Sequence, residues 1–406
     1  MTLLVFAFCR RVHGTRCAWL AVIVVATMPL FVANARTVIL DMMLALFVCG
    51  AIFAGYLAEL QEGAARRNWH LAGAALGGMA TLVKGPVGFL IPALVLLVFH
   101  RLEGRGGAWK RMLSPLNILV FLAVTLPWFV ALCVRHPDFL QYGMVEESFK
   151  RFTSARRFSR AEPFYFYVPI VAATFLPWSL LLPEAIWKAW QERGPKNRAD
   201  RLCLVWAVVV VVFFSISQSK LPGYILSVTV ACGILAARVL ESALAAPDRW
   251  AGGLMRRATA ALAGLCLIVA VVAASAGVSG MQALARPLRI TPDEAGGLYY
   301  AAIPVMIGLG VFAGFGVLAF RRRSIRLCFL CLALFPPVFG HTSFHVFSHI
   351  FEAKSARLLA DKCAALPATT ELACLQCFPN GLSFYIGSTL TVFSSDGSEL
   401  PSNYIV

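Results

Sequence analysis

Long apolar runs follow one another along nearly the whole chain, with short basic loops between them, and they limit its fold more than any other feature. A helix needs about 20 apolar residues to cross a bilayer. We interpret eleven runs as membrane-spanning helices, at residues 17–33, 38–57, 71–83, 87–99, 118–134, 165–182, 202–215, 225–240, 258–277, 298–320 and 327–339. The sequence therefore predicts an all-α polytopic membrane protein with about eleven to twelve spans.

One part of this pattern allows two interpretations. Residues 71–99 are too few for two complete spans, so they form either a tight helical hairpin or one long span with a lysine inside it. The hairpin would have its tip at Lys84, Gly85 and Pro86. Glycine and proline disfavour a continuous helix, and they therefore favour the hairpin.

Composition excludes several classes of protein. With 59% hydrophobic and 14% charged residues, the chain has more apolar side chain than one soluble core can bury. The net charge of +16 does not indicate nucleic-acid binding, because most of the cations fall in short loops between apolar runs. Most of the twelve cysteines stand singly in apolar runs. Cys374 and Cys377 have the spacing of a redox pair or half a metal site, and a disulfide or free thiol pair is favoured over metal.

The basic residues alternate between two sets of loops. By the positive-inside rule the richer set is cytoplasmic and the chain is a multi-pass protein of the inner (plasma) membrane. That set lies near residues 10–16, 66–67, 101–111, 188–201, 249–257 and 321–326. The opposite face is sparsely charged except for a cluster from Lys150 to Arg160. A cationic cluster on the outer face requires a local reason, either lipid headgroups or a bound phosphate.

The two ends of the chain differ from its middle. We expect a transmembrane domain over residues 1–340 and a partial periplasmic α/β domain over residues 341–406, where a polar helix precedes strand-like alternation. At the other end, Met1 opens only a fragment of an apolar run. We expect upstream sequence to be missing.

Three cationic features stand at the tips of apolar segments on the predicted outer face: Lys84, the Lys150/Arg151 pair, and Lys220. Lys84 and Lys220 adjoin glycine or proline turns that leave bare backbone beside the ammonium, and this favours anion binding over snorkelling to headgroups. Asp41 begins an apolar span, where a carboxylate is either functional or paired with Arg36.

Two further groups are candidates for metal or acid–base chemistry. Glu146 and Glu147 lie beside the cationic cluster and fit ion pairing best, with metal ligation or a base as alternatives. His341, His345 and His349 share one face of a helix, but without a fourth ligand they are surface histidines by default. No cofactor is certain, and a divalent metal is the one possibility that these residues leave open.

Five stretches, in order, resemble the superfamily of aminoarabinose transferases and protein O-mannosyltransferases, which use polyprenyl-phosphate sugars. They are RTVILDMMLALFV, GGMATLVKGPVGFLIPAL, LPWFVAL with HPDFLQYGMVEESFKRF, PFYFYVPIVAATFLPWSLLLP, and FFSISQSKLPGYILS. The resemblance covers most of residues 37–240. It implies a membrane glycosyltransferase with a polyprenyl-phosphate donor and a lipid A-type, glycan or protein acceptor.

By this resemblance Lys84, Arg151 and Tyr224, with Lys220 nearby, contact the donor's phosphate, and Asp41 lines the active cavity. The family's metal takes a histidine where this chain has Glu146 and Glu147. We also expect the family's first span and first outer loop, with its acidic catalytic residue, to be absent. The alternative functions are an inactive fragment or a non-catalytic membrane subunit, and then a lipid transporter, for which no pseudo-symmetric halves are visible.

Overall fold

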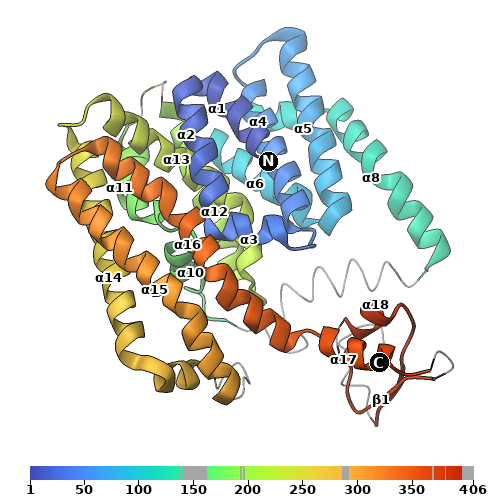
Figure 1. The fold of residues 1–406 in the computed structure, drawn as a ribbon. Helices are drawn as coiled ribbons and strands as arrows, with labels where there is room; N and C mark the ends of the chain where they lie inside the picture. The colour runs from blue at the N-terminus through green and yellow to red at the C-terminus, as the bar shows by residue number, and fades with distance from the viewer. Residues whose placement is uncertain are drawn as a thin grey trace. The chain divides into compact units, whose positions relative to one another are not determined.

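The computed structural model of the chain consists mainly of helices, in agreement with the apolar pattern (Figure 1). The structure describes residues 1–137, 139, 162–192, 194, 197–285, 292–367, 370–379 and 381–395. The chain forms two compact units. The first holds residues 1–265 and 312–337, and the second holds residues 266–311 and 338–406.

The first unit contains most of the helices. In chain order these are α1 (Thr2–Val12), α2 (Thr15–Thr27), α3 (Pro29–Arg36), α4 (Asp41–Ala58), α5 (Gly63–Lys84), α6 (Val87–Leu102), α7 (Ala108–Met112), α8 (Pro115–Arg135), α10 (Tyr167–Thr174), η2 (Trp178–Leu181), α11 (Leu182–Gln191), α12 (Arg198–Ile216), η4 (Pro222–Ile225) and α13 (Leu226–Ala245). Three long helices, α14 (Trp250–Ala285), α15 (Pro292–Arg321) and α16 (Ile325–Lys354), contribute residues to both units.

Within the described residues, seven helices are long and apolar enough to cross a membrane, or nine if each of two bent helix pairs is one span. These nine correspond to nine of the eleven predicted spans. The other two predicted spans are α5 and α6, and α6 has only 16 residues. The chain is therefore a multi-pass membrane protein. The number of described helices that are long and apolar enough to span a membrane is lower than the predicted eleven to twelve.

Helices α5 and α6 pack together as the predicted hairpin rather than as one long span. Helix α5 ends at Lys84, and Gly85 follows with a φ of +71°. Glycine is favoured there because the left-handed region penalises a Cβ atom. Pro86 directly precedes α6 and cannot continue the helical hydrogen bonding of α5. The Lys84, Gly85 and Pro86 sequence thus sets both the end of one helix and the start of the next.

Two bends in the first unit are joined to each other. Helices α2 and α3 meet at 66°, with Pro29 as the first residue of α3, and the pair formed by α10 and the η2–α11 segment is bent by 110°. The fully buried indole of Trp178 donates its Nε1–H to Thr27 Oγ1 over 2.9 Å. This hydrogen bond connects the end of α2 to the second bend.

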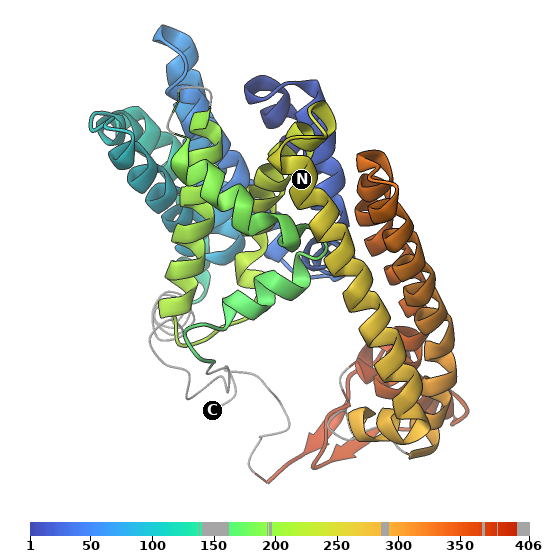
Figure 2. The ribbon, with the colours of Figure 1, turned by 90° about the vertical axis from the view of Figure 1, so that its left-hand side faces the viewer.

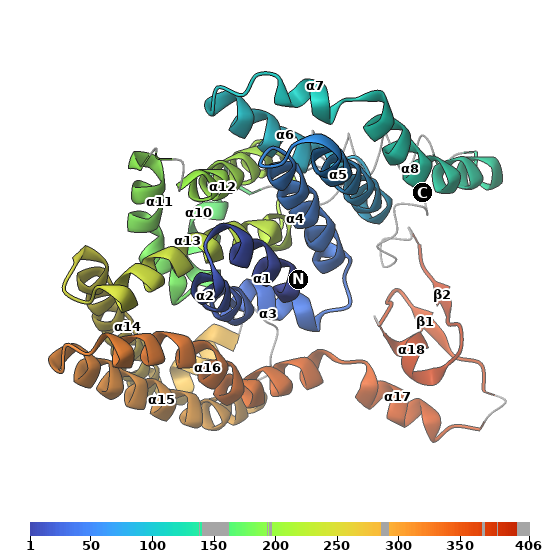
Figure 3. The ribbon, with the colours of Figure 1, turned by 90° about the horizontal axis from the view of Figure 1, so that it is seen from above.

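Helix α13 forms the centre of the first unit, where it lies among α2, α4, α11 and α12 (Figure 3). Gly233 allows the close approach of α2, because a Cβ atom there would lie 2.4 Å from a methyl group of Val25. On α4, Phe53 stacks on Phe8 with centroids 3.8 Å apart and meets Trp206 edge-on. By contrast, most of α8 is exposed, as expected of a helix that faces lipid.

Within the first unit, parts of α14, α15 and α16 run side by side (Figure 2). Gly316 on α15 lies against Ala263 on α14, since a Cβ atom on the glycine would come within 2.8 Å of the alanine Cβ. Phe312 on α15 meets Phe335 on α16 edge-on, with centroids 5.7 Å apart. Small residues and aromatic pairs therefore hold this layer together.

The second unit ends in a small segment with helices α17 (Arg357–Ala364) and α18 (Leu382–Ile386) and strands β1 (Ala373–Leu375) and β2 (Thr391–Phe393). The strands pair in parallel, with Cys374 opposite Val392. Ala356, Ala360 and Leu382 form its buried cluster. Cys374 and Cys377 are free thiols, which is one of the two states expected for them.

Candidate functional site

Asp41 and Lys84 form an ion pair at one end of the first unit. Asp41 is the first residue of α4 and Lys84 is the last residue of α5, and Lys84 Nζ donates to Asp41 Oδ1. The partner of Asp41 is therefore a lysine 43 residues later, rather than Arg36, which was the structural alternative. The two side chains keep 14% and 34% of their surface exposed, so the pair is accessible.

Tyr224 and Gly223 bring a third segment, η4, to this pair. Lys84 Nζ lies 5.1 Å from the centroid of the Tyr224 ring, which is within the range of a cation–π contact. The ring of Tyr224 in turn packs against Phe214, with centroids 5.2 Å apart. Gly223 leaves room for the Asp41 carboxylate, because a Cβ atom on it would lie 2.9 Å from Asp41 Oδ2 and the carboxylate would have to shift. The predicted residues Asp41, Lys84 and Tyr224 thus meet at one place.

Asn34, on α3, also belongs to this site, although the sequence did not single it out. Its Nδ2–H donates to the carbonyl oxygen of Leu30 over 2.8 Å. Its Oδ1 is buried and has no hydrogen-bond partner among the described residues. That oxygen lies 3.5 Å from the point that a Cβ atom on Gly223 would occupy. Asn34 carries no sequence pattern of its own, whereas Gly223 belongs to the proline and glycine turn after Lys220.

Lys220 is placed differently from the sequence expectation. The side chain is 5% exposed, and its Nζ donates to the carbonyl oxygens of Glu162 at 2.9 Å and Ser217 at 2.6 Å. In the described part of the chain, Lys220 has no hydrogen bond to Asp41 or Lys84. Two of its three N–H groups therefore hold the backbone before α10 and after α12, and the third has no hydrogen-bond partner among the described residues.

Glu146, Glu147 and Arg151 lie outside the described residues, so their roles stay predictions. Among the residues that the structure does describe, no three His, Cys, Asp or Glu side chains converge to hold a metal ion. His341, whose residue is exposed, is not part of such a group. The described residues on their own do not fit a divalent metal.

The arrangement of Asp41, Lys84 and Tyr224 suits reversible binding of an anion. An ammonium group held between a carboxylate and an aromatic face is fixed in place but not fully enclosed. An incoming phosphate would compete with the carboxylate for the ammonium and would gain a charge-assisted hydrogen bond. The same exchange would release Asp41 to accept a different donor.

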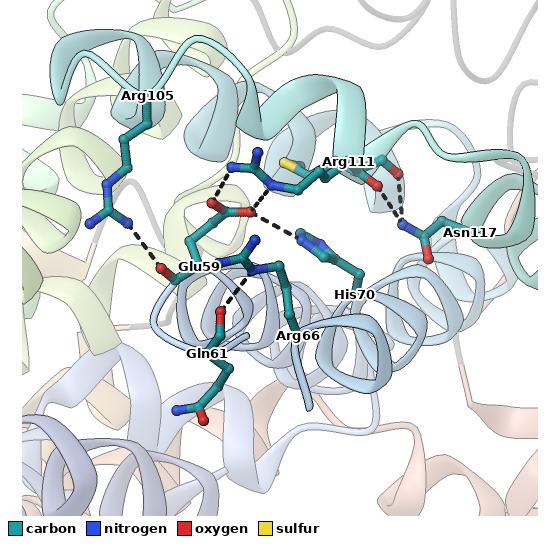
Figure 4. Close-up of polar contacts among 8 residues, drawn as sticks. Glu59, Gln61, Arg66, His70, Arg105, Arg111 and Asn117 are labelled. Carbon is teal, nitrogen blue, oxygen red and sulfur yellow. Dashed lines mark hydrogen bonds and ion pairs between the residues drawn. The ribbon is translucent and has the colours of Figure 1, made fainter. Parts of the chain in front are cut away.

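A second polar cluster lies at the opposite end of α4, which is 18 residues and thus about 27 Å long. Glu59, the C-cap of α4, is 8% exposed (Figure 4). Its carboxylate accepts hydrogen bonds from His70 Nε2 at 3.1 Å and from Arg111 Nε at 3.0 Å, and Arg105 donates to its carbonyl oxygen at 3.1 Å. Asn117 Nδ2 donates to the carbonyl oxygen of Arg111 at 2.9 Å.

The charge of Glu59 is stabilised by these partners. Burial by itself would raise the pKa of Glu59, but the hydrogen bonds and charge of Arg111, together with His70, outweigh it and hold the pKa below its ordinary value. Glu103 has a similar arrangement, since Arg201 grips both of its carboxylate oxygens, at 2.6 and 2.9 Å, and lowers its pKa. The basic loops of the predicted cytoplasmic face are therefore partly neutralised by structural ion pairs.

Comparison with known proteins finds relatives of this chain. Residues 1–143 match the family described as dolichyl-phosphate-mannose-protein mannosyltransferase. The chain is similar to two proteins named undecaprenyl phosphate-alpha-4-amino-4-deoxy-L-arabinose arabinosyl transferase. The one from Photorhabdus laumondii is 33% identical over 222 residues, which are 53% of this chain and 38% of that protein. The one from Edwardsiella ictaluri is 30% identical over 342 residues, which are 81% of this chain and 58% of that protein.

The fold is also found in a solved structure. The crystal structure of ArnT from Cupriavidus metallidurans bound to undecaprenyl phosphate matches 97% of this chain and 70% of that chain, with a TM-score of 0.76 and 26% sequence identity. The ArnT structure in the apo state matches with the same score. The chain spans about half the length of the curated relatives that it matches.

Proposed function

We propose that this chain, which belongs to the aminoarabinose transferase and protein O-mannosyltransferase superfamily, moves a sugar from a polyprenyl-phosphate donor to a lipid A-type acceptor. The single observation that carries the proposal is the partly exposed Lys84 ammonium, held between Asp41 and the ring of Tyr224. These three residues come from three different segments, and all three fall within the stretches that resemble the family.

In this proposal Lys84 stabilises the leaving group. An acceptor oxygen forms a bond to the anomeric carbon of the sugar, while the bond from that carbon to the phosphate oxygen breaks and the phosphate takes the electron pair. Negative charge on the phosphate increases as the bond breaks, so a positioned cation stabilises the transition state more than the ground state. Arg151, Lys220 and Tyr224 are further hydrogen-bond donors to the phosphate in this scheme, and the ring of Tyr224 also positions Lys84.

The acceptor decides whether a base is needed. A phosphate oxygen of a lipid acceptor is already deprotonated and can attack directly. A hydroxyl acceptor, as on a protein or glycan, must lose its proton, and Asp41, Glu146 and Glu147 are the carboxylates proposed for that step. Once phosphate displaces it from Lys84, the Asp41 carboxylate is free to accept this proton.

We also propose on which side of the membrane the site lies and how many times the chain crosses it. The site would lie at the outer face of the inner membrane, opposite the loops rich in arginine and lysine. Eleven to twelve crossings would require that the α5–α6 hairpin also lies in the bilayer. Residues 1–340 would then form the transmembrane domain, and residues 341–406 a periplasmic α/β domain.

A lysine exchange tests the proposal. Lys84→Ala should be introduced into the gene for this protein, in cells that lack their own aminoarabinose transferase, and lipid A should be analysed by mass spectrometry. Loss of a preorganised electrostatic contact costs about 2–4 kcal/mol in the activation barrier, so modification should fall by about 30- to 1,000-fold. Lys362→Ala, at an exposed lysine of α17, is the matched control and should modify lipid A as the unchanged protein does. Normal modification by Lys84→Ala, at equal protein abundance, would overturn the proposal.

A further inference from the structure

The proposed function does not use a cavity in the first unit, between α4, α5, α6 and α8. It has a volume of about 290 Å³, and its lining is almost entirely apolar, with Phe89, Pro92, Leu96 and Phe121 among the larger side chains. The polar side chains that line it are His70 and Asn117. The cavity is thus amphipathic along its length, like a lipid molecule.

Small residues create this space. Gly73, Ala74 and Gly77 line it from α5, and Ala93 lines it from α6. A Cβ atom added to Gly77 would meet no atom within 4 Å, so the helix there faces open space rather than a packed neighbour. The outer wall comes from α8, most of which is exposed on the first unit. Apolar space beside a lipid-facing helix is accessible to a hydrocarbon chain from the bilayer.

The polar end of the cavity is surrounded by cations. Figure 4 shows His70 and Asn117 close to Arg111, whose side chain is 41% exposed although its Nε and one terminal nitrogen bond Glu59. Next to it, Lys110 lies over the ring of Trp109, which is 46% exposed. Tryptophan beside lysine and arginine is typical of the headgroup level of a membrane.

The nearby charges favour an anionic headgroup. The loop and first helical turns at residues 59–67 and 103–111 carry five arginines and lysines and three glutamates. Two of those glutamates, Glu59 and Glu103, are already bound to arginines. Each exposed arginine or lysine near a membrane surface attracts anionic lipid by about 1 kcal/mol. A zwitterionic headgroup would gain much less from this surface.

We propose that this cavity binds one acyl chain of an anionic glycerophospholipid, whose phosphate lies against Arg111 and Lys110. The polar end of the cavity is at the Glu59 end of α4, about 27 Å from Asp41 and Lys84 at the other end. The phosphate of a molecule bound here therefore cannot be the phosphate held by Lys84. The site is a second lipid site of the same unit, separate from the one in the proposed function.

The experiment uses the full chain, purified in detergent and stripped of lipid, with dioleoyl phosphatidylglycerol and dioleoyl phosphatidylcholine as probes. Native mass spectrometry at increasing lipid concentration measures the affinity for the first bound molecule. Phosphatidylglycerol should bind at least several-fold more tightly than phosphatidylcholine. Gly77→Leu should fill the cavity and weaken phosphatidylglycerol binding about 15- to 60-fold, because two or three methylene groups lose their burial at about 0.8 kcal/mol each.

Gly264→Leu is the matched control, because Gly264 is also a helical glycine with no atom within 4 Å of an added Cβ. It should bind phosphatidylglycerol as the unchanged chain does. Ala93→Leu is a second filling variant if Gly77→Leu does not fold, and it should weaken binding in the same way. Equal binding of the two lipids, or unchanged binding by the filling variants, would overturn the proposal. Displacement of the bound phosphatidylglycerol by polyprenyl phosphate at equal concentration would also overturn it.

Discussion

The cluster around Glu59 allows a quantitative prediction for stability. We choose Glu59→Gln, which keeps the volume of the side chain but removes its charge and one acceptor oxygen. Glu59 accepts hydrogen bonds from His70 and, through two nitrogens, from Arg111. A hydrogen bond to a charged group contributes about 1.5–3 kcal/mol to stability. Because the Arg111 side chain is 41% exposed, water screens its share, and we expect a net loss of about 2 kcal/mol.

The assay is the midpoint of thermal unfolding in detergent, followed by intrinsic fluorescence. A loss of this size should lower the midpoint on the order of 5 °C at pH 7. Glu62→Gln is the matched control, because Glu62 is an exposed carboxylate three residues away and has no ion pair among the described residues. Its substitution should change stability by less than about 0.5 kcal/mol.

The pH dependence makes the test sharper. The pKa of Glu59 is held below its ordinary value of 4.5 in the folded chain. Its contribution to stability is therefore complete above that ordinary value and is lost as the pH falls through the lower, folded-state pKa. The difference between the unchanged chain and Glu59→Gln should shrink as the pH is lowered below 4.5. A difference that stays constant or grows at low pH, or no difference at pH 7, would refute the reasoning.

Two further predictions concern Gly223 and Trp178. Gly223→Ala should reduce the rate of sugar transfer by about 100-fold without lowering protein abundance, because the added Cβ would lie 2.9 Å from Asp41 Oδ2 and displace the ion pair. Gly253→Ala is the control, because Gly253 is a helical glycine with free space around it. Equal transfer rates for the two variants would contradict this prediction. Trp178→Phe and Thr27→Val should each destabilise the chain, because each removes the 2.9 Å hydrogen bond between the two side chains. A double-mutant cycle should give a coupling energy of about 1 kcal/mol, and additive effects would argue against that bond.

The sequence predicted the helical character and several local features. The hairpin at Lys84, Gly85 and Pro86 was predictable because glycine and proline act on the backbone within a few residues. Nine of the predicted spans were found because hydropathy is also a local property. The predicted number of spans exceeded the number of long apolar helices, because hydropathy does not distinguish a full span from a short helix such as α6.

Contacts between distant residues were not predictable in the same way. Asp41 was considered with Arg36, five residues before it, but its partner is 43 residues after it. Lys220 was expected to face a ligand, yet two backbone carbonyls take most of its N–H groups, and nothing in the side-chain types indicates this. Arg111 was counted only among the basic residues that indicate the cytoplasmic face. Its buried partner Glu59 lies 52 residues earlier, so the ion pair was not visible in the sequence. These pairings depend on how the helices pack, and the packing cannot be read from the residue types of a single sequence.

The Asp41 and Lys84 pair has a consequence for how the chain is built into a membrane. A lone charge at the centre of a membrane helix costs about 2.5–3.5 kcal/mol on insertion scales, and less near its ends. During synthesis α4 brings its carboxylate first, and the compensating ammonium arrives only when the last residue of α5 has been made. Helices α4 and α5 together carry no net charge from this pair, whereas either helix alone does. We therefore expect the insertion of these two helices to be coupled, and an exchange at Lys84 should affect biogenesis as well as the phosphate binding proposed for it.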